Sequence, residues 1–148
     1  MLKVFLAEDE FIVREGIRNN IDWRSEGFDF CGDAPDGELA YPMILERKPD
    51  ILITDIRMPF MDGLSLCRLV SHTLPTCRMV ILSGHEEFAY AKEALHIGVS
   101  DYLLKPITGA ELLSVIKRLG DKILEERQVQ AATASVASRE SESASPSG

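Results

Sequence analysis

Five short apolar segments alternate with five segments of helical spacing, and this alternation constrains the fold more than any other feature of the chain. The apolar segments, which we expect to be strands, are residues 2–7, 28–34, 51–54, 79–82 and 99–104. The segments expected to be helical are residues 11–21, 37–46, 64–71, 87–97 and 108–124. Strands and helices that alternate in this way are joined by right-handed crossovers. The chain is therefore predicted to form an α/β fold, with one parallel sheet covered by helices on both faces.

The composition changes sharply after Arg127. Residues 128–148 contain no aromatic residue, Leu or Ile, and Ala and Ser dominate. Such a segment cannot bury enough apolar surface to offset the entropy lost on ordering. We therefore expect one domain over residues 1–127 and a disordered Ala/Ser-rich tail or linker over residues 128–148, although its first few residues could extend the preceding helix.

The charge balance argues against a nucleic-acid surface on this domain. The chain has 16 Lys and Arg against 24 Asp and Glu, a net charge of −8, whereas phosphate contacts need clustered basic residues. No apolar run is long enough to span a membrane. We expect a cytoplasmic protein that binds neither a membrane nor nucleic acid itself. Its three cysteines (Cys31, Cys67 and Cys77) are expected to be reduced and mostly buried, because they form no CxxC pair.

Polar residues stand where the predicted strands end, and in open parallel sheets the ligand site lies outside these carboxyl ends. They are Glu8, Asp9 and Glu10 after the first strand, Asp55 after the third, Ser83 after the fourth and Lys105 after the fifth. Crowded carboxylates resist ionisation unless a cation is present, and oxygen ligands of this kind suit Mg²⁺. A hydroxyl and an ammonium opposite the metal would complete a pocket for a phosphoryl group. One central carboxylate could then act as nucleophile and form an acyl phosphate.

Four strings at these strand ends resemble the receiver domains of bacterial two-component response regulators. They are residues 4–10 (VFLAEDE), 53–64 (ITDIRMPFMDGL), 81–84 (ILSG) and 100–106 (SDYLLKP). The similarity covers roughly residues 2–125, almost everything but the tail. It implies a flavodoxin-like sheet with strand order 2-1-3-4-5, doubly wound with five helices. It also implies that Asp55 takes a phosphoryl group from the phosphohistidine of a sensor histidine kinase.

The resemblance assigns Mg²⁺ ligands beside Asp55. Glu8 and Asp9 correspond to the acidic pair that supports the metal, together with Asp55 itself and the backbone carbonyl of Arg57. Most relatives have Asp where this chain has Glu8, and the longer side chain could act through a water.

The resemblance also assigns residues that sense the phosphate. Ser83 corresponds to the switch hydroxyl, Lys105 to the lysine that pairs with the phosphate, and Tyr102 to an aromatic switch. The bond between Lys105 and Pro106 is expected to be cis. Phosphorylation would change the face formed by residues 87–97, the fifth strand and the last helix, and so control homodimerisation and transcriptional output.

A finer similarity concerns residues 21–23 (IDW), 27–28 (GF) and 32–38 (GDAPDGE). These strings resemble receivers fused to AraC-type helix-turn-helix output domains, through which DNA would be bound. No such domain follows here, so the chain is either an isolated receiver or a stand-alone one with an unusual tail.

Alternative interpretations stay open from the residues alone. Asp55 could simply cap the end of a strand, and Tyr102 could be ordinary strand packing. An aspartyl hydrolase of the haloacid dehalogenase type is a weaker alternative, because its D-x-D motif is Asp55-Ile56-Arg57 here. A receiver that docks or dimerises without phosphorylation is the stronger one. We expect no enzyme beyond a signalling domain that catalyses its own phosphoryl uptake and release. Arg57 and His85 are hypothesised to tune how long the acyl phosphate survives, or else to be solvated rim side chains.

Overall fold

Five parallel strands form a single sheet in the computed structural model, which describes residues 1–84 and 88–143. The strands are β1 (Leu2–Ala7), β2 (Phe28–Ala34), β3 (Ile51–Asp55), β4 (Arg78–Ser83) and β5 (Asp101–Leu104). Their order is β2-β1-β3-β4-β5, and each neighbouring pair is parallel. This confirms the predicted flavodoxin-like topology, in which β2 and β5 are the edge strands.

The helices follow the strands in the predicted alternation. They are α1 (Phe11–Asn20), α2 (Gly37–Arg47), α3 (Gly63–Thr73), α4 (Phe88–Ile97) and α5 (Gly109–Ser143). Local caps fix where several of them begin: the carboxylates of Asp36 and Asp62 accept the backbone N–H groups of Leu39 and Ser65 at 2.8 and 2.7 Å. Thr108 and Glu111 exchange side-chain-to-backbone hydrogen bonds in a capping box at the start of α5.

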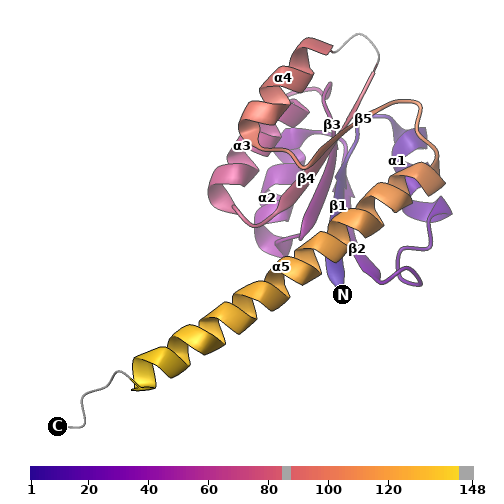
Figure 1. Ribbon diagram of the computed structural model, residues 1–148. Helices are drawn as coiled ribbons and strands as arrows, with labels where there is room; N and C mark the ends of the chain where they lie inside the picture. Colours follow the sequence, from indigo (N-terminus) through magenta and orange to yellow (C-terminus); the bar gives the residue numbers. More distant parts are fainter. Residues whose placement is uncertain (85–87, 144–148) are drawn as a thin grey trace. The chain divides into compact units, whose positions relative to one another are not determined.

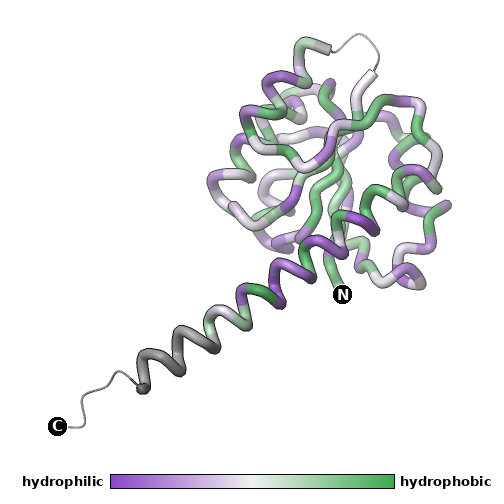
Figure 2. The backbone as a smooth tube through the Cα atoms, viewed as in Figure 1, coloured by the Kyte–Doolittle hydropathy of each residue, from purple (hydrophilic) through white to green (hydrophobic). Residues whose placement is uncertain are grey.

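The central strands provide most of the core. Every residue of β3 is buried, and the apolar side chains of β1 and β4 are almost entirely inaccessible. Figure 1 shows α2, α3 and α4 on one face of the sheet and α1 on the other. Figure 2 shows the most hydrophobic backbone in the strands between them, as expected for a parallel sheet covered on both sides.

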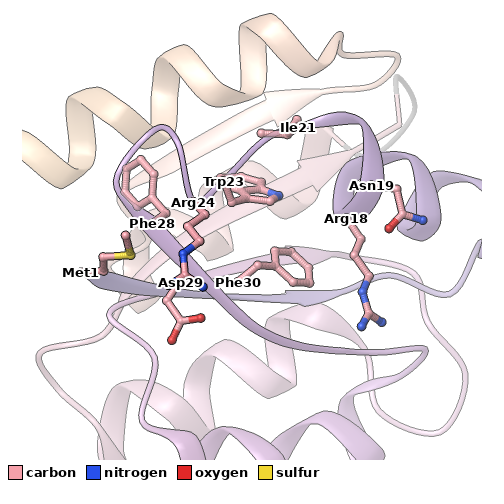
Figure 3. A pocket seen from close by; sticks show the side chains of 9 residues that line it. All are labelled: Met1, Arg18, Asn19, Ile21, Trp23, Arg24, Phe28, Asp29 and Phe30. Atoms are coloured by element: carbon pink, nitrogen blue, oxygen red, sulfur yellow. The ribbon is translucent and has the colours of Figure 1, made fainter.

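An aromatic cluster anchors the segment between α1 and β2. The Trp23 ring lies 6.0 Å from that of Phe28 and 5.8 Å from that of Phe30, and its indole N–H donates to the carbonyl of Ile17 at 3.0 Å. The three rings line a cavity of about 580 Å³ together with Arg18 and Arg24, and Figure 3 shows how these side chains lie. Phe28 pairs with Leu2, so the cluster lies at the amino ends of β1 and β2, opposite the predicted site. The strings 21–23 and 27–28 therefore contribute to packing.

The chain divides into two units, residues 1–114 and 115–148, and α5 begins in the first and continues into the second. Residues 128–143 continue the helix α5. Ala, Gln and Glu favour helices, and neither Gly nor Pro occurs between Asp121 and Ser143, so nothing local ends α5 earlier. The domain boundary at residue 127 stays a prediction. None of the described helices, α5 included, combines the length and apolar character needed to cross a membrane.

Candidate functional site

Strand register brings the predicted polar residues to one rim of the sheet. Ala7 is opposite Thr54 on β3, Asp55 is opposite Leu82 on β4, and Ser83 is opposite Leu104 on β5. The residues that follow these strand ends therefore share one edge, although up to 97 positions separate them in sequence. The fold thus explains why distant polar residues of this chain meet.

The ammonium of Lys105 is the centre of the site. Its Nζ lies 2.9 and 3.0 Å from the two carboxylate oxygens of Glu8 and 3.0 Å from Oδ2 of Asp55. The backbone N–H of Lys105 donates to the carbonyl of Ser83 at 2.7 Å, which holds the chain beside β4. Oδ1 of Asp55 accepts the N–H of Ile56 at 2.8 Å. Both oxygens of Asp55 are thus held in place by donors. The peptide bond between Lys105 and Pro106 is cis, which confirms that prediction.

Burial makes the carboxylates of the site reluctant to ionise. Glu8 is fully inaccessible and Asp55 is 6% exposed. Burial, helped by the nearby charge of Asp55 and opposed by Lys105, raises the pKa of Glu8 to about 7. Burial also raises the pKa of Asp55, again against the opposing influence of Lys105. For Lys105 itself, burial lowers the pKa, but hydrogen bonds to Glu8 and Asp55 outweigh it and the net shift is upward.

The acidic run after β1 has the donor chemistry of a divalent cation site. Carboxylate oxygens of Glu8, Asp9 and Glu10 lie within 4.8 Å of one another. Asp9 also lines an open cavity of about 370 Å³ together with Arg57, at the end of the strand that carries Asp55. Several carboxylates and one ammonium leave an excess of negative charge here, and oxygen donors suit a hard cation such as Mg²⁺. The residues therefore fit the predicted metal, although Glu8 directs both of its oxygens to Lys105.

Ser83 and Tyr102 are joined by a hydrogen bond. The phenolic hydroxyl of Tyr102 donates to Oγ of Ser83 at 2.7 Å, and the Ser83 hydroxyl lies 3.1 Å from the carbonyl of Gly84. Ser83 is fully buried and Tyr102 is half-buried. This contact couples the two residues to which the resemblance assigns a switch role. His85, the other residue predicted near this loop, lies outside the described residues.

Two supporting residues were missed by reasoning from the sequence. Arg14 donates to the backbone carbonyl of Glu8 at 2.7 Å, and its guanidinium pairs with Asp33, so α1 holds the loop that carries the acidic run. At Gly63, a Cβ atom would lie 1.8 Å from the carbonyl oxygen of Asp55. Gly63 also donates its N–H to the carbonyl of Ile56 at 2.8 Å. Its position directly after the cap Asp62, in a loop that returns to the strand, is the only signal that the sequence offers.

Known proteins match this chain over most of its length. Residues 4–117 match the family described as "Response regulator receiver domain". The chain is 43% identical over 119 residues to the uncharacterized transcriptional regulatory protein YesN of Bacillus subtilis (strain 168), a match that covers 80% of this chain and 32% of that protein. The match to the transcriptional regulatory protein HptR of Staphylococcus aureus (strain NCTC 8325 / PS 47) covers 50% of that protein. Both relatives are therefore two to three times as long as the segment that matches this chain.

Solved structures of two-component response regulators also resemble this chain. The REC domain of AraT, a response regulator from Geobacillus stearothermophilus, is 41% identical with a TM-score of 0.80, and the match covers 85% of this chain and 98% of that one. A two component transcriptional regulator AraC from Clostridium phytofermentans ISDg is 30% identical with a TM-score of 0.74, covering 88% and 99%.

Proposed function

This chain belongs to the response regulator receiver domain family, and on that premise we propose that it is a switch whose state depends on phosphorylation of Asp55. It is the receiver domain of a two-component transcriptional regulator. The observation that carries the proposal is the contact of one ammonium, Lys105, with both Asp55 and Glu8 at the carboxyl rim of the sheet. Phosphoryl-transfer sites need this kind of positioned charge more than they need covalent chemistry.

In the proposed reaction, Oδ2 of Asp55 forms a bond to phosphorus while the bond between phosphorus and the imidazole nitrogen of a kinase phosphohistidine breaks. The N–H of Ile56 fixes the other oxygen, so that Asp55 presents one defined nucleophile. Lys105 remains protonated because its pKa is raised, and its ammonium pairs with the phosphoryl oxygens. Release is the attack of water on phosphorus, which regenerates the carboxylate. The domain thus acts on itself as a signalling module, and no external substrate is turned over.

The residues proposed to hold Mg²⁺ are Asp9, Asp55, the backbone carbonyl of Arg57 and Glu8, the last directly or through a water. When bound, the ion supplies positive charge against the phosphoryl group. Asp9 and Glu10 are exposed and Asp9 lines the cavity beside Arg57, which supports entry from solvent. Arg57 is also proposed to influence the lifetime of the acyl phosphate, as is His85.

We propose that the signal leaves through Ser83 and Tyr102. Phosphate on Asp55 would attract the Ser83 hydroxyl, and the hydrogen bond to Tyr102 would then change. Tyr102 lies in β5, beside β4, so its reorientation would shift the population of two arrangements of the face that contains α4 and β5. That face is proposed to mediate homodimerisation. DNA would be contacted by an output domain, the phosphoryl donor would be a sensor histidine kinase, and the setting would be the cytoplasm.

The test is incubation of the full chain with acetyl phosphate and Mg²⁺, followed by measurement of its intact mass. We expect a gain of one phosphoryl group that disappears in Asp55→Asn and that is accompanied by a change of size in solution. No gain in mass would contradict the proposal and would favour a receiver that docks without phosphorylation.

A further inference from the structure

Phe60 has a backbone conformation that a bulky residue rarely adopts. Its φ is +68°, and the N–H of Met61 donates to the carbonyl of Pro59 at 2.7 Å across it. An i to i+2 hydrogen bond around a residue of positive φ defines a classic γ-turn, which is rare and strained. Glycine, or less often asparagine, is the usual solution where φ must be positive.

The side chain of Phe60 gains nothing in return for this strain. It is 85% exposed, and no large apolar side chain among the described residues is more exposed. Lys48, which also has positive φ, differs in that its N–H closes α2 on the carbonyl of Ile44 at 2.8 Å. That is ordinary helix termination. Phe60 therefore combines backbone strain with an exposed aromatic ring, and neither stabilises the isolated domain.

The loop around Phe60 is firmly attached on both sides. Ile56 and Met58 are buried before it, and the carbonyl of Met61 accepts the N–H of Gly37 at 3.0 Å after it. Asp62 then caps α3. The turn is therefore a fixed platform, meaning that its backbone is held in place while the ring of Phe60 faces solvent. Little conformational entropy of this loop would be lost when a partner binds.

The platform stands at the entrance to the proposed acceptor site. Pro59, the preceding residue, lines the same open cavity as Asp9 and Arg57. After the neighbouring strand β1, Phe11 and Ile12 follow the acidic run at the start of α1 and are 65% and 84% exposed. Since β1 and β3 are hydrogen-bonded neighbours, exposed apolar groups follow both of the strand ends that carry the acids. A small phosphoryl donor needs no such groups, whereas a protein donor must bury surface around its phosphorylated side chain.

We propose that Phe60 is a docking residue for the protein that delivers the phosphoryl group, and that its strained turn serves to present the ring to that partner. This rests on the proposed function of Asp55. The aromatic ring would insert among apolar side chains of the donor while the donor's phosphohistidine faces Asp55. Aromatic residues, phenylalanine included, are enriched at protein–protein interfaces, and a few residues buried at the centre of an interface carry most of its binding energy.

The test compares two donors on the full chain. One is acetyl phosphate, and the other is an autophosphorylated histidine-kinase core, chosen from a panel for the fastest transfer to the wild-type chain. Phe60→Asn removes the ring but tolerates positive φ, Phe60→Leu retains an apolar side chain, and Leu39→Ala removes an exposed apolar side chain from α2 as a control. We expect Phe60→Asn to raise the KM for the kinase core about tenfold. The rate with acetyl phosphate should change less than about twofold, and Phe60→Leu should restore most of the loss.

Four other outcomes would overturn either the docking role of Phe60 or the proposed function of Asp55. Equal kinase KM in wild type and Phe60→Asn would overturn docking while leaving Asp55 as acceptor. An equal loss with both donors would show that the turn supports the site itself, and this too would overturn docking. If acetyl phosphate labels the chain but no kinase core does, docking is again overturned. If neither donor labels the wild type, the proposed function fails first.

Discussion

The two ends of the parallel sheet are built on opposite principles. At the carboxyl rim, Glu8, Asp55 and Lys105 place charges where burial raises the pKa of both carboxylates. At the amino ends of β1 and β2, the Trp23 cluster packs rings against one another and satisfies its one indole N–H. Buried charges are poor at stabilising a fold, because desolvation offsets their mutual attraction. Buried rings stabilise it through area and packing.

This contrast teaches which substitutions should separate stability from function. Changes in the aromatic cluster should lower the free energy of unfolding while leaving the chemistry of the folded molecules intact. Changes in the carboxyl rim should alter the chemistry of Asp55 without lowering the free energy of unfolding. The exceptions are the few positions where backbone packing and chemistry coincide.

Trp23→Ala should give the largest loss of stability. The side chain is 3% exposed and contacts both Phe28 and Phe30, so its removal should lower the free energy of unfolding by about 3–5 kcal/mol. Urea denaturation measures this loss, and Trp23→Phe should restore part of it. Below the unfolding transition, labelling by acetyl phosphate should match the wild type. Loss of labelling in folded Trp23→Ala would break the contrast between the two ends.

Gly63→Ala should lower both the free energy of unfolding and the rate of labelling, so the two effects do not separate at this position. A Cβ atom there would lie 1.8 Å from the carbonyl oxygen of Asp55, and backbone on both sides must move to admit it. We expect a loss of about 3 kcal/mol in the free energy of unfolding, together with slower labelling of Asp55.

Gly16→Ala is the matched control for this change. Its new Cβ would meet only Nδ2 of Asn20 at 3.7 Å within α1, and alanine favours a helix interior by about 0.5–1 kcal/mol. It should therefore be neutral or stabilising. Equal effects of the two substitutions would contradict the close approach of Gly63 to Asp55.

The pH dependence of the free energy of unfolding should also distinguish the carboxyl rim from the aromatic cluster. The pKa of Glu8 rises from 4.5 to about 7 on folding, so the folded state holds the proton more tightly. Its contribution to stability is fully present below about pH 4.5 and is lost as the pH rises through about 7. In the absence of Mg²⁺, Glu8→Gln should match wild type near pH 4.5 and should exceed its free energy of unfolding by about 3 kcal/mol near pH 8. A difference that does not change with pH would show that Glu8 ionises freely in the folded state.

The strands followed from the sequence because each is a short apolar run between clear caps such as Asp36 and Thr108, whereas their order followed from the resemblance to receiver domains. Ligand sites of open parallel sheets lie outside the carboxyl ends of the strands, and this predicts that Asp55 and Lys105 lie close together. The support of Arg14 for Glu8 could not be foreseen, because an arginine outside the apolar face of a predicted helix has many possible partners. Nor could the contact of Lys105 with both carboxylate oxygens of Glu8 be foreseen, because the pattern gives the strand end and not the direction of a buried side chain. The character of the segment after Arg127 stays a prediction, because its low apolar content favours disorder while its Ala and Gln favour a helix.

The smallest effect is expected at the hydrogen bond between Tyr102 and Ser83. Tyr102→Phe keeps the ring in β5 and removes only the hydroxyl that donates to Ser83 at 2.7 Å, so the free energy of unfolding should fall by about 1 kcal/mol. Tyr41→Phe is the control, because its hydroxyl makes a bond of 2.6 Å to Thr73 between exposed parts of α2 and α3. Both variants should be labelled on Asp55 by acetyl phosphate. Only Tyr102→Phe should alter the change in size that follows labelling, measured by sedimentation. An unaltered response would mean that Tyr102 is strand packing, and that the rim passes its signal by another route.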